Sequence, residues 1–137
     1  MSFVLDSSVV LAWIYSEETT DSITRIFELL RKQGAWVPGL WRLEVANVLQ
    51  MGVRRGRTDA SFRDHALADL TYFPIEVDRE TDLRAWGRTL ELAEEHGLTV
   101  YDAAYLELAL RRKLPLATLD AELQQAAANE NLNLLAR

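Results

Sequence analysis

The sequence predicts an α/β fold, a three-layer α/β/α sandwich around a parallel sheet of four or five strands. Short apolar runs alternate with amphipathic segments from one end of the chain to the other. The intervening segments are long enough to cross over a sheet as helices, which favours parallel strands with helices on both faces. The length of 137 residues suits one domain, and we find no linker, repeat or low-complexity stretch. We therefore predict a single domain over residues 1–137.

The strands are predicted from four short apolar runs. The first run leads into Asp6-Ser7-Ser8, which is typical of a buried strand that enters a helix. The runs cover residues 3–5, 35–38, 74–77 and 115–118. Residues 132–135 would add a fifth strand, with Asn129 or Asn131 taking a left-handed turn, since the segment before it lacks a glycine.

Helices are predicted where apolar residues recur three and four positions apart. The expected ranges are 9–15, 23–30, 41–52, 59–70, 83–93 and 101–109, with a short helix starting at Asp120. Leu83, Trp86 and Leu90 mark the apolar side of one helix, and Tyr101 and Tyr105 mark that of another. We expect these side chains, and most of the four tryptophans, to pack in the core.

The composition indicates an ordered, soluble protein. Apolar residues make up 49% of the chain and charged residues 26%. The absence of cysteine excludes disulfides, zinc–thiolate sites and thiol nucleophiles, and it fits a reducing cytoplasm. The start of the chain does not look like a signal peptide, and no apolar stretch approaches the ~20 residues that span a bilayer, so we expect no membrane association. The net charge of −6 argues against a broad nucleic-acid coat but suits a site for divalent cations.

Four acidic residues are expected near one edge of the sheet. Asp6 directly follows the first strand, and Asp120 follows the fourth strand closely. Glu44 lies at the edge of an apolar helix stripe, and Asp102 lies in the first turn of its helix. In open α/β sheets, ligands bind beyond the carboxyl ends of the strands. The four acids together therefore predict a binding or catalytic site.

A structural interpretation exists for each acid taken singly. Asp6 and Asp120 could be helix N-caps, and Thr99 to Asp102 fits the capping-box pattern. Glu44 could be a surface residue near an arginine. Capping does not account for Glu44, however, because it is predicted to lie well inside its helix.

Four segments, each containing one of these acids, resemble the motifs of the PIN-domain family, in particular the bacterial VapC toxins of toxin–antitoxin pairs. The segments are Leu5-Asp6-Ser7-Ser8-Val9-Val10, Pro38 with Leu43-Glu44-Val45-Ala46-Asn47-Val48-Leu49, Leu98-Thr99-Val100-Tyr101-Asp102-Ala103-Ala104-Tyr105-Leu106-Glu107-Leu108-Ala109, and Leu116-Ala117-Thr118-Leu119-Asp120-Ala121-Glu122-Leu123. The resemblance extends over essentially the whole chain. It implies a metal-dependent endoribonuclease, a cognate VapB-type antitoxin that occludes the site, and a homodimer.

The resemblance assigns the metal and catalytic roles to Asp6, Glu44, Asp102 and Asp120, and a supporting hydroxyl to Thr118. No histidine lies in a motif and cysteine is absent, so Mg²⁺ or Mn²⁺ is expected in place of zinc. Asp6 and Asp102 are expected to bind metal directly, and Glu44 to bind metal or orient the water. Asp120 would bind directly or through water.

Other residues have weaker assignments. Ser7 and Thr118 are predicted to orient the metal ligands. Two interpretations of Arg54, Arg55 and Arg57 are equally favoured: they contact RNA phosphates, or they complement the dipole of the preceding helix.

Two other protein classes with an early aspartate or a similar fold lack support in the sequence. An aspartyl-phosphate phosphatase normally needs a second Asp two residues after the first, where this chain has Ser8. A response-regulator receiver needs an early acidic pair and a phosphoacceptor after a middle strand, and neither is found. The alternative function is a catalytically inactive PIN-like module that binds RNA or a protein.

Overall fold

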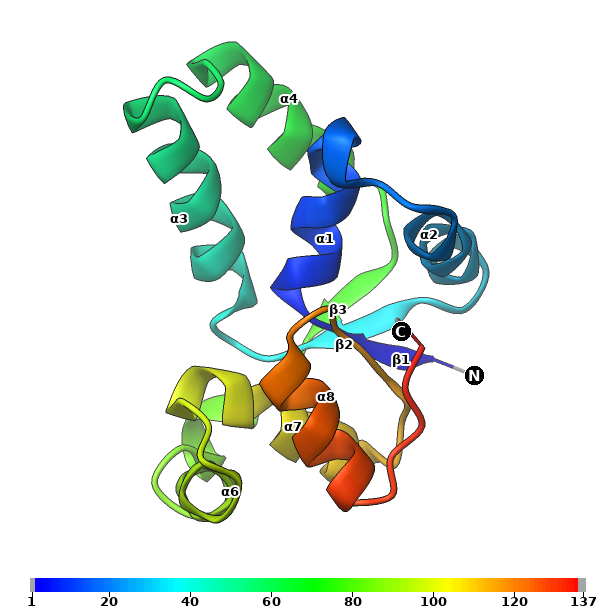
Figure 1. Ribbon diagram of the computed structural model, residues 1–137, viewed down its shortest axis with the longest axis vertical. Coiled ribbons are helices and arrows are strands. Elements are labelled where there is room, and N and C mark those ends of the chain that lie inside the picture. The colour runs from blue at the N-terminus through cyan, green and yellow to red at the C-terminus, as the bar shows by residue number, and fades with distance from the viewer. Residues whose placement is uncertain (1, 136–137) are drawn as a thin grey trace.

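The computed structural model describes residues 2–135 and contains a four-stranded parallel sheet in the order β3-β2-β1-β4 (Figure 1). The strands are β1 (Phe3–Leu5), β2 (Ala35–Val37), β3 (Ile75–Val77) and β4 (Leu116–Ala117). β1 is central, and its Val4 pairs with Trp36 on one side and Leu116 on the other. All pairs are parallel, which confirms the predicted α/β class.

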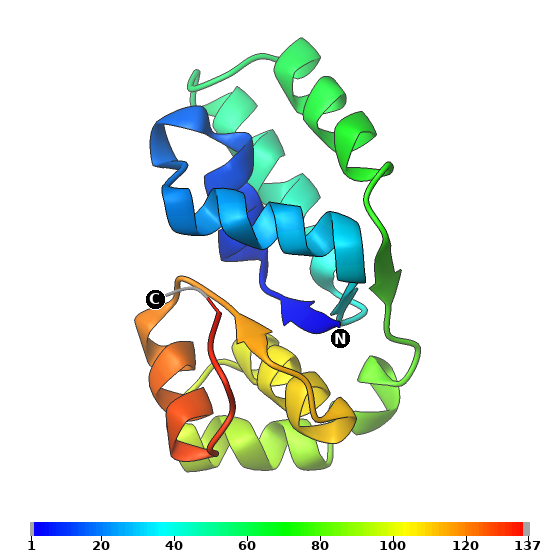
Figure 2. The same ribbon diagram turned by 90° about the vertical axis from the view of Figure 1, so that its right-hand side faces the viewer.

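Helices cover both faces of the sheet (Figures 1 and 2). One face carries α1 (Ser7–Ile14), the 3₁₀ helix η1 (Ser16–Glu18), α2 (Asp21–Gln33), α3 (Trp41–Arg54) and α4 (Ala60–Leu70). The other carries α5 (Thr81–Arg84), α6 (Arg88–His96), α7 (Val100–Arg112) and α8 (Ala121–Asn129). No helix among residues 2–135 is both long enough and apolar enough to cross a membrane.

The core lies on both sides of β1. Its three residues are fully buried, and seven consecutive residues of α7, from Ala103 to Ala109, are buried against the sheet. On the opposite face, the rings of Trp13, Phe27 and Phe73 pack together, with Trp13 stacked on Phe27 at 4.5 Å between centroids. This packing fixes the ends of β1 and α7, which matter for the site.

The predicted fifth strand is reduced to a single parallel bridge between Leu116 and Leu134 in the described part of the chain. The backbone of Leu116 accepts from Leu135 and donates to Asn133. Asn131 has φ 61°, so it takes the left-handed turn that the missing glycine would have taken. The segment therefore lies along the free edge of β4 without forming a full strand.

The prediction of one helix over 83–93 is wrong. The chain forms α5 and α6 with a break at Gly87, whose ψ of −110° is not helical. Leu83 is 78% exposed and Trp86 94% exposed, and half of Leu90 is exposed as well. A stripe that looks continuous in the sequence is thus split between two helices and does not face the core.

Two further placements differ from expectation. Tyr101 faces solvent, because the buried side of α7 begins at Ala103. Glu44 lies in the first turn of α3, since that helix begins at Trp41. An acid in the first turn is favoured by the helix dipole, so the position of Glu44 by itself is less diagnostic than the sequence suggested.

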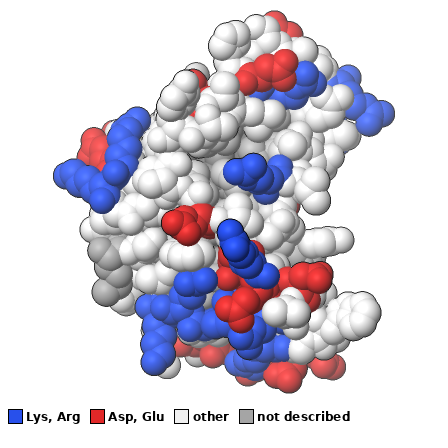
Figure 3. Space-filling model, turned by 180° about the vertical axis from the view of Figure 1, so that it is seen from behind, with Lys and Arg blue, Asp and Glu red and all other residues white. Residues whose placement is uncertain are grey.

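An ion-pair network that the sequence did not reveal joins β3 to the end of α7. Asp78, 2% exposed, follows β3 and accepts from Arg111 at 2.7 Å and from Arg112 at 3.3 Å. Arg111 also pairs with Glu107 and Glu80. Seen from behind, basic and acidic side chains mix on the lower half of the molecule (Figure 3). The network fixes the far end of α7 against the sheet edge.

Candidate metal-binding and catalytic site

The four predicted acids come from four elements that meet at the carboxyl edge of the sheet. Asp6 lies between β1 and α1, and Asp120 between β4 and α8. Glu44 and Asp102 lie in the first turns of α3 and α7. Figure 1 shows the starts of these helices gathered beside the ends of β1 and β4. Asp6 and Asp120 are therefore neighbours, although they lie 114 positions apart in the chain.

Asp6 is the buried centre of the site. It is 4% exposed, and its backbone N–H donates to the carbonyl of Ala117 at 2.9 Å. Its Oδ2 accepts from the hydroxyls of Ser8 at 2.6 Å and Thr118 at 2.7 Å. Asp6 occupies the N-cap position of α1, but its side chain makes no capping bond. Its carboxylate is therefore held by hydroxyl groups and faces the other acids.

Thr118 and Ser8 link Asp6 to the segment that carries Asp120. The Thr118 hydroxyl also accepts from the backbone N–H of Asp120 at 3.1 Å. The Ser8 hydroxyl accepts from the backbone N–H of Leu119 at 3.0 Å. These bonds fix the turn after β4 relative to β1.

Glu44 is held by Tyr105, whose phenol donates a hydrogen bond to Oε1 of the carboxylate. Tyr105 is fully buried in α7, one turn beyond Asp102. Burial, together with the negative charges of Asp6 and Glu44, raises the pKa of the phenol, which keeps it protonated as a donor. Tyr105 therefore couples the first turn of α3 to α7.

The structural interpretation holds in part for the other two acids. The Asp120 carboxylate caps α8, accepting from the backbone N–H of Leu123 at 2.8 Å. Thr99 caps α7, and its hydroxyl accepts from the backbone N–H of Asp102 at 3.1 Å. Only Oδ2 of Asp120 is used in capping, and the capping bond of α7 uses the backbone N–H of Asp102 and not its carboxylate, so both carboxylates keep oxygens for the site.

The acids disfavour one another's ionisation. Burial raises the pKa of Asp6, and the charge of Asp120 adds to the shift, although two hydroxyl hydrogen bonds oppose it. Burial raises the pKa of Glu44, and Asp6 and Asp102 add to it against the hydrogen bond from its tyrosine. Burial and the charges of Asp120 and Asp6 raise the pKa of Asp102. Ionisation of these carboxylates is therefore unfavourable in the site, and a bound cation would favour it.

No lysine, arginine or histidine within residues 2–135 forms an ion pair that relieves this repulsion. None of the ion pairs that join residues 2–135 includes Asp6, Glu44, Asp102 or Asp120. An all-oxygen, anionic donor set fits a hard divalent cation such as Mg²⁺ or Mn²⁺. The residues present therefore fit the metal that the sequence predicted.

The four acids are not drawn as tightly together as metal ligands would be. Among the described residues, the group of acids and histidines with three donor atoms within 4.8 Å of one another is Glu95, His96 and Glu130. That group lies at the far ends of α6 and α8, and its His96–Glu130 pair at 2.7 Å joins those two helices.

A family model for the PIN domain matches residues 3–129. The chain belongs to the PIN-domain family. It is 31% identical over 125 residues to Ribonuclease VapC3 of Pyrobaculum aerophilum, covering 91% of this chain and 94% of the relative.

Solved structures agree with the family assignment. A crystal structure of another Pyrobaculum aerophilum protein matches with TM-score 0.70 and 26% identity, covering 98% of this chain and 84% of the other. The structure of VapBC2 from Rickettsia felis bound to a DNA fragment from its promoter matches with TM-score 0.66. At 16% identity, with 98% of this chain and 97% of the other covered, that second match shows the fold alone.

The predicted supporting residues of this PIN domain are placed unequally. Thr118 contacts Asp6, as described above. Ser7 approaches Asp6 through its backbone N–H, and its hydroxyl is directed to Tyr105. The serine hydroxyl that contacts Asp6 belongs instead to Ser8, for which the sequence predicted no supporting role.

The three arginines of this PIN domain also differ from one another. Arg57 is engaged by Glu17 at 2.6 Å and Glu18 at 2.8 Å, and its guanidinium lies 3.6 Å from the ring centre of Tyr15. Arg54 ends α3 and Arg55 is its C-cap, and both are exposed. Arg57 is therefore already partnered, whereas Arg54 and Arg55 stay candidates for a phosphate contact.

Proposed function

We propose that this PIN domain is an endoribonuclease that depends on Mg²⁺ or Mn²⁺ and acts as the toxin of a type II toxin–antitoxin pair. One observation carries the proposal: four carboxylates from four elements gather at the sheet edge, the pKa values of Asp6, Glu44 and Asp102 are raised, and no ion pair within residues 2–135 includes any of the four. The name of the relative, Ribonuclease VapC3, supports RNA as the substrate.

The residues have distinct roles in this proposal. Asp6 and Asp102 hold the metal directly, Asp120 holds it directly or through water, and Glu44 binds metal or orients the attacking water. Thr118 and Ser8 keep the Asp6 carboxylate in one orientation through their hydroxyls. Tyr105 does the same for Glu44, so that both carboxylates present fixed oxygens.

The bound metal would supply a water of lowered pKa and neutralise charge at the scissile phosphate. Glu44, turned toward the centre by Tyr105, is positioned to orient that water. Because the nucleophile is water and not the 2′-hydroxyl of the RNA, the products carry a 5′-phosphate and a 3′-hydroxyl.

A metal-removal experiment tests the proposal. Dialysis against EDTA stops cleavage of an oligoribonucleotide, and Mg²⁺ or Mn²⁺ restores it. Sequencing of the RNA ends gives the product chemistry, with Asp6→Asn as the control for contaminating nucleases. Undiminished cleavage in metal-free buffer, or 2′,3′-cyclic ends, would contradict the mechanism.

The alternative, an inactive module that binds RNA or protein, predicts a different result. It would bind RNA without cutting it, and Mg²⁺ titration by calorimetry would show no site. The intact set of four acids favours the active enzyme over this alternative.

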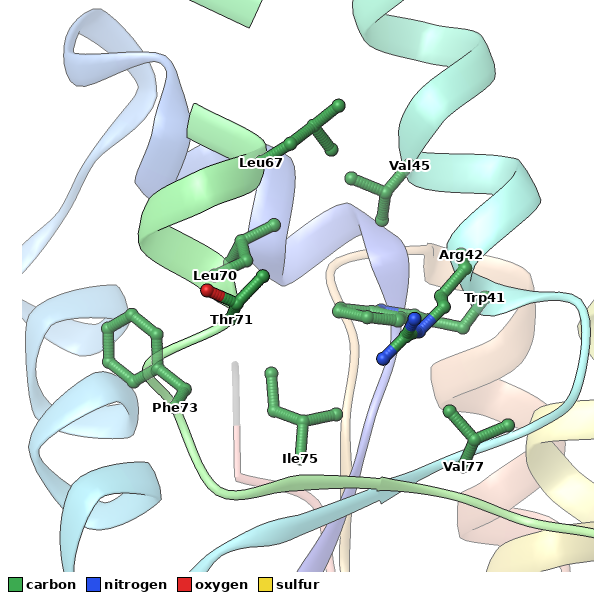
Figure 4. A pocket seen from close by; sticks show the side chains of 9 residues that line it. All are labelled: Trp41, Arg42, Val45, Leu67, Leu70, Thr71, Phe73, Ile75 and Val77. Carbon is green, nitrogen blue, oxygen red and sulfur yellow. The ribbon is translucent and has the colours of Figure 1, made fainter. Parts of the chain in front are cut away.

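We also propose a VapB-type antitoxin and a second copy of this chain as partners. A pocket of about 270 Å³ between α3, α4 and β3 supports the first, since it is largely apolar (Figure 4). Its lining residues are Trp41, Arg42, Val45, Leu67, Leu70, Thr71, Phe73, Ile75 and Val77. An amphipathic helix of the antitoxin would place its apolar face there.

Coexpression with the neighbouring reading frame tests the partner, and light scattering of the purified chain tests the homodimer. Leu67→Glu is expected to weaken capture of the antitoxin, while Leu90→Glu, at an exposed site on α6, leaves it intact. Equal capture by both variants would remove the pocket from the interface. A cytoplasmic location follows from the same proposal, because the RNA substrate is cytoplasmic.

A further inference from the structure

Large apolar side chains that are exposed to solvent directly precede three of the four acids in the chain. Leu43 directly precedes Glu44 and is 76% exposed; Tyr101 directly precedes Asp102 and is 66% exposed. Leu119 directly precedes Asp120 and is 45% exposed. We call Leu43, Tyr101 and Leu119 the apolar collar. Exposed apolar groups gathered at one place mark a contact surface.

The collar comes from the same three elements that carry the acids. Leu43 lies in the first turn of α3, Tyr101 in the first turn of α7, and Leu119 in the turn between β4 and α8. The hydrogen bond from Tyr105 of α7 to Glu44 joins the start of α3 to α7, and the Thr118 hydroxyl joins the turn after β4 to Asp6. The collar therefore borders the site itself and is not a separate patch.

The collar offers little positive charge to a ligand. The arginines at the end of α7 are held by Asp78. Arg42, beside Leu43, lines the pocket between α3 and β3 (Figure 4). At the collar itself, a ligand would therefore be held by apolar and aromatic faces, while any phosphate contact would come from the more distant Arg54 and Arg55 at the other end of α3.

We propose that the collar binds the bases of the nucleotides next to the scissile bond, with Tyr101 as the stacking surface. This inference rests on the proposed function. Every base has a π-face that stacks on an exposed aromatic ring whatever its sequence. Only unpaired bases are free to do so, because in duplex RNA the bases are stacked inside the helix and a side chain cannot reach them face-on. Leu43 and Leu119 would pack against the flanking nucleotides from α3 and α8.

The test compares Tyr101→Ala and Tyr101→Phe with the wild type, using Tyr72→Ala as the matched control. Tyr72 is an 87% exposed tyrosine between α4 and β3, at the opposite edge of the sheet. The probe is a single-stranded oligoribonucleotide carrying 2-aminopurine next to the cleavage site, whose fluorescence falls on stacking. Binding is measured in the non-cleaving Asp6→Asn background, and KM and kcat in the active protein.

Tyr101→Ala is expected to weaken binding and raise KM by about 5- to 150-fold, with loss of the fluorescence change. Tyr101→Phe keeps the ring and stays within about twofold of the wild type, as does Tyr72→Ala. Calorimetric Mg²⁺ affinity stays unchanged in Tyr101→Ala, which separates loss of stacking from damage to the neighbouring Asp102.

Several outcomes overturn the inference. An unchanged KM and fluorescence signal in Tyr101→Ala removes the base contact, and equal losses in Ala and Phe variants assign the effect to the hydroxyl. If Tyr101→Ala binds RNA normally but loses its coexpressed protein partner, the collar is a protein interface. Failure of the wild type to cut any RNA would instead refute the proposed function, and the fluorescence measurement would still decide the role of Tyr101.

Discussion

Asp6 combines burial, two hydroxyl donors and nearby acids in one side chain. In Asp6→Asn, the charge that a cation needs is lost, so cleavage is expected to fall by more than about 100-fold. The same change removes a buried charge whose pKa is raised by burial, so the free energy of unfolding without metal is expected to rise. Cleavage assays and urea denaturation measure the two effects, and a well-folded variant that cuts RNA fully would contradict the assignment.

The raised pKa values of Asp6, Glu44 and Asp102 have a pH consequence. Folding raises these pKa values, so the native state binds more protons than the unfolded state just above the ordinary carboxyl range. At neutral pH, where all three groups are ionised, they lower the free energy of unfolding the most. This destabilisation is lost as the pH falls through the raised pKa values toward the ordinary carboxyl range.

Mg²⁺ is accordingly expected to raise Tm at pH 7.5 and to lose this effect progressively toward acid pH, where protons replace it. Differential scanning fluorimetry across pH measures this, with Asp6→Asn/Asp102→Asn as the control that should show no Mg²⁺ effect. A Tm shift that does not depend on pH or on these acids would refute the prediction.

The arginines allow a matched comparison. Arg57→Gln is expected to leave RNA binding nearly unchanged, because its guanidinium is held by Glu17 and Glu18. Arg54→Gln and Arg55→Gln should each weaken binding and lower the salt slope by about 1, as expected for the loss of a phosphate contact. RNA affinity measured at several salt concentrations distinguishes the two interpretations of these arginines. If all variants and the wild type have the same salt slope, only the helix-dipole interpretation is left.

At the scale of the element, Gly52 departs from what helix propensity favours. It lies in α3, where alanine would be better by ~1 kcal/mol, but a Cβ at this position would meet the Tyr15 hydroxyl at 2.8 Å. Gly52→Ala is therefore expected to lower the free energy of unfolding by about 1–3 kcal/mol through overpacking.

The double variant Gly52→Ala/Tyr15→Phe should recover this loss and exceed the wild type. The buried Tyr15 hydroxyl has no hydrogen-bond partner within residues 2–135, so its removal relieves both the clash and an unsatisfied group. A double-mutant cycle in urea measures the coupling, and additive effects would show that the two groups do not meet.

Helix starts were predictable where a short polar side chain caps them. Asp59, Thr99 and Asp120 accept from backbone N–H groups three residues on, at the expected starts of α4, α7 and α8. The break between α5 and α6 was not predictable, because Leu83, Trp86 and Leu90 keep helical spacing across it. Periodicity reports spacing along the chain, whereas exposure depends on which segments later cover a face.

For the whole molecule, the sequence predicted the parallel sheet and the edge at which the acids meet, because strand order along the chain and crossover length restrict the topology. It could not show the contacts of Ser8, Tyr105 and Asp78. Each depends on partners distant in the chain, such as Tyr105 on Glu44 and Asp78 on Arg111. The family motifs pointed to the acids and to the Thr118 hydroxyl, but not to the hydroxyl groups of Ser8 and Tyr105 that also hold them.

The Asp78 network predicts unequal effects of charge removal. The Asp78 side chain is fully buried against two arginines, so Asp78→Ala is expected to lower the free energy of unfolding by about 3–5 kcal/mol. Hydrogen bonds from Arg111 and Thr81 outweigh the burial of Asp78 and lower its pKa, so its contribution is lost only in strong acid. Glu17→Gln, in an exposed pair, should give no measurable change, and similar effects of both would argue against burial as the cause.

The helix α7 is attached at both of its ends, and this has a mechanical consequence. Its first turn carries Asp102 and its last turn carries the arginines bound to Asp78, about 14 Å away along the helix. A helix of this length transmits a shift at one end to the other with little bending. Weakening the ion pairs between Asp78 and the arginines would therefore let Asp102 change its position. The affinity for the proposed metal ion would then fall before unfolding of the whole domain could be detected.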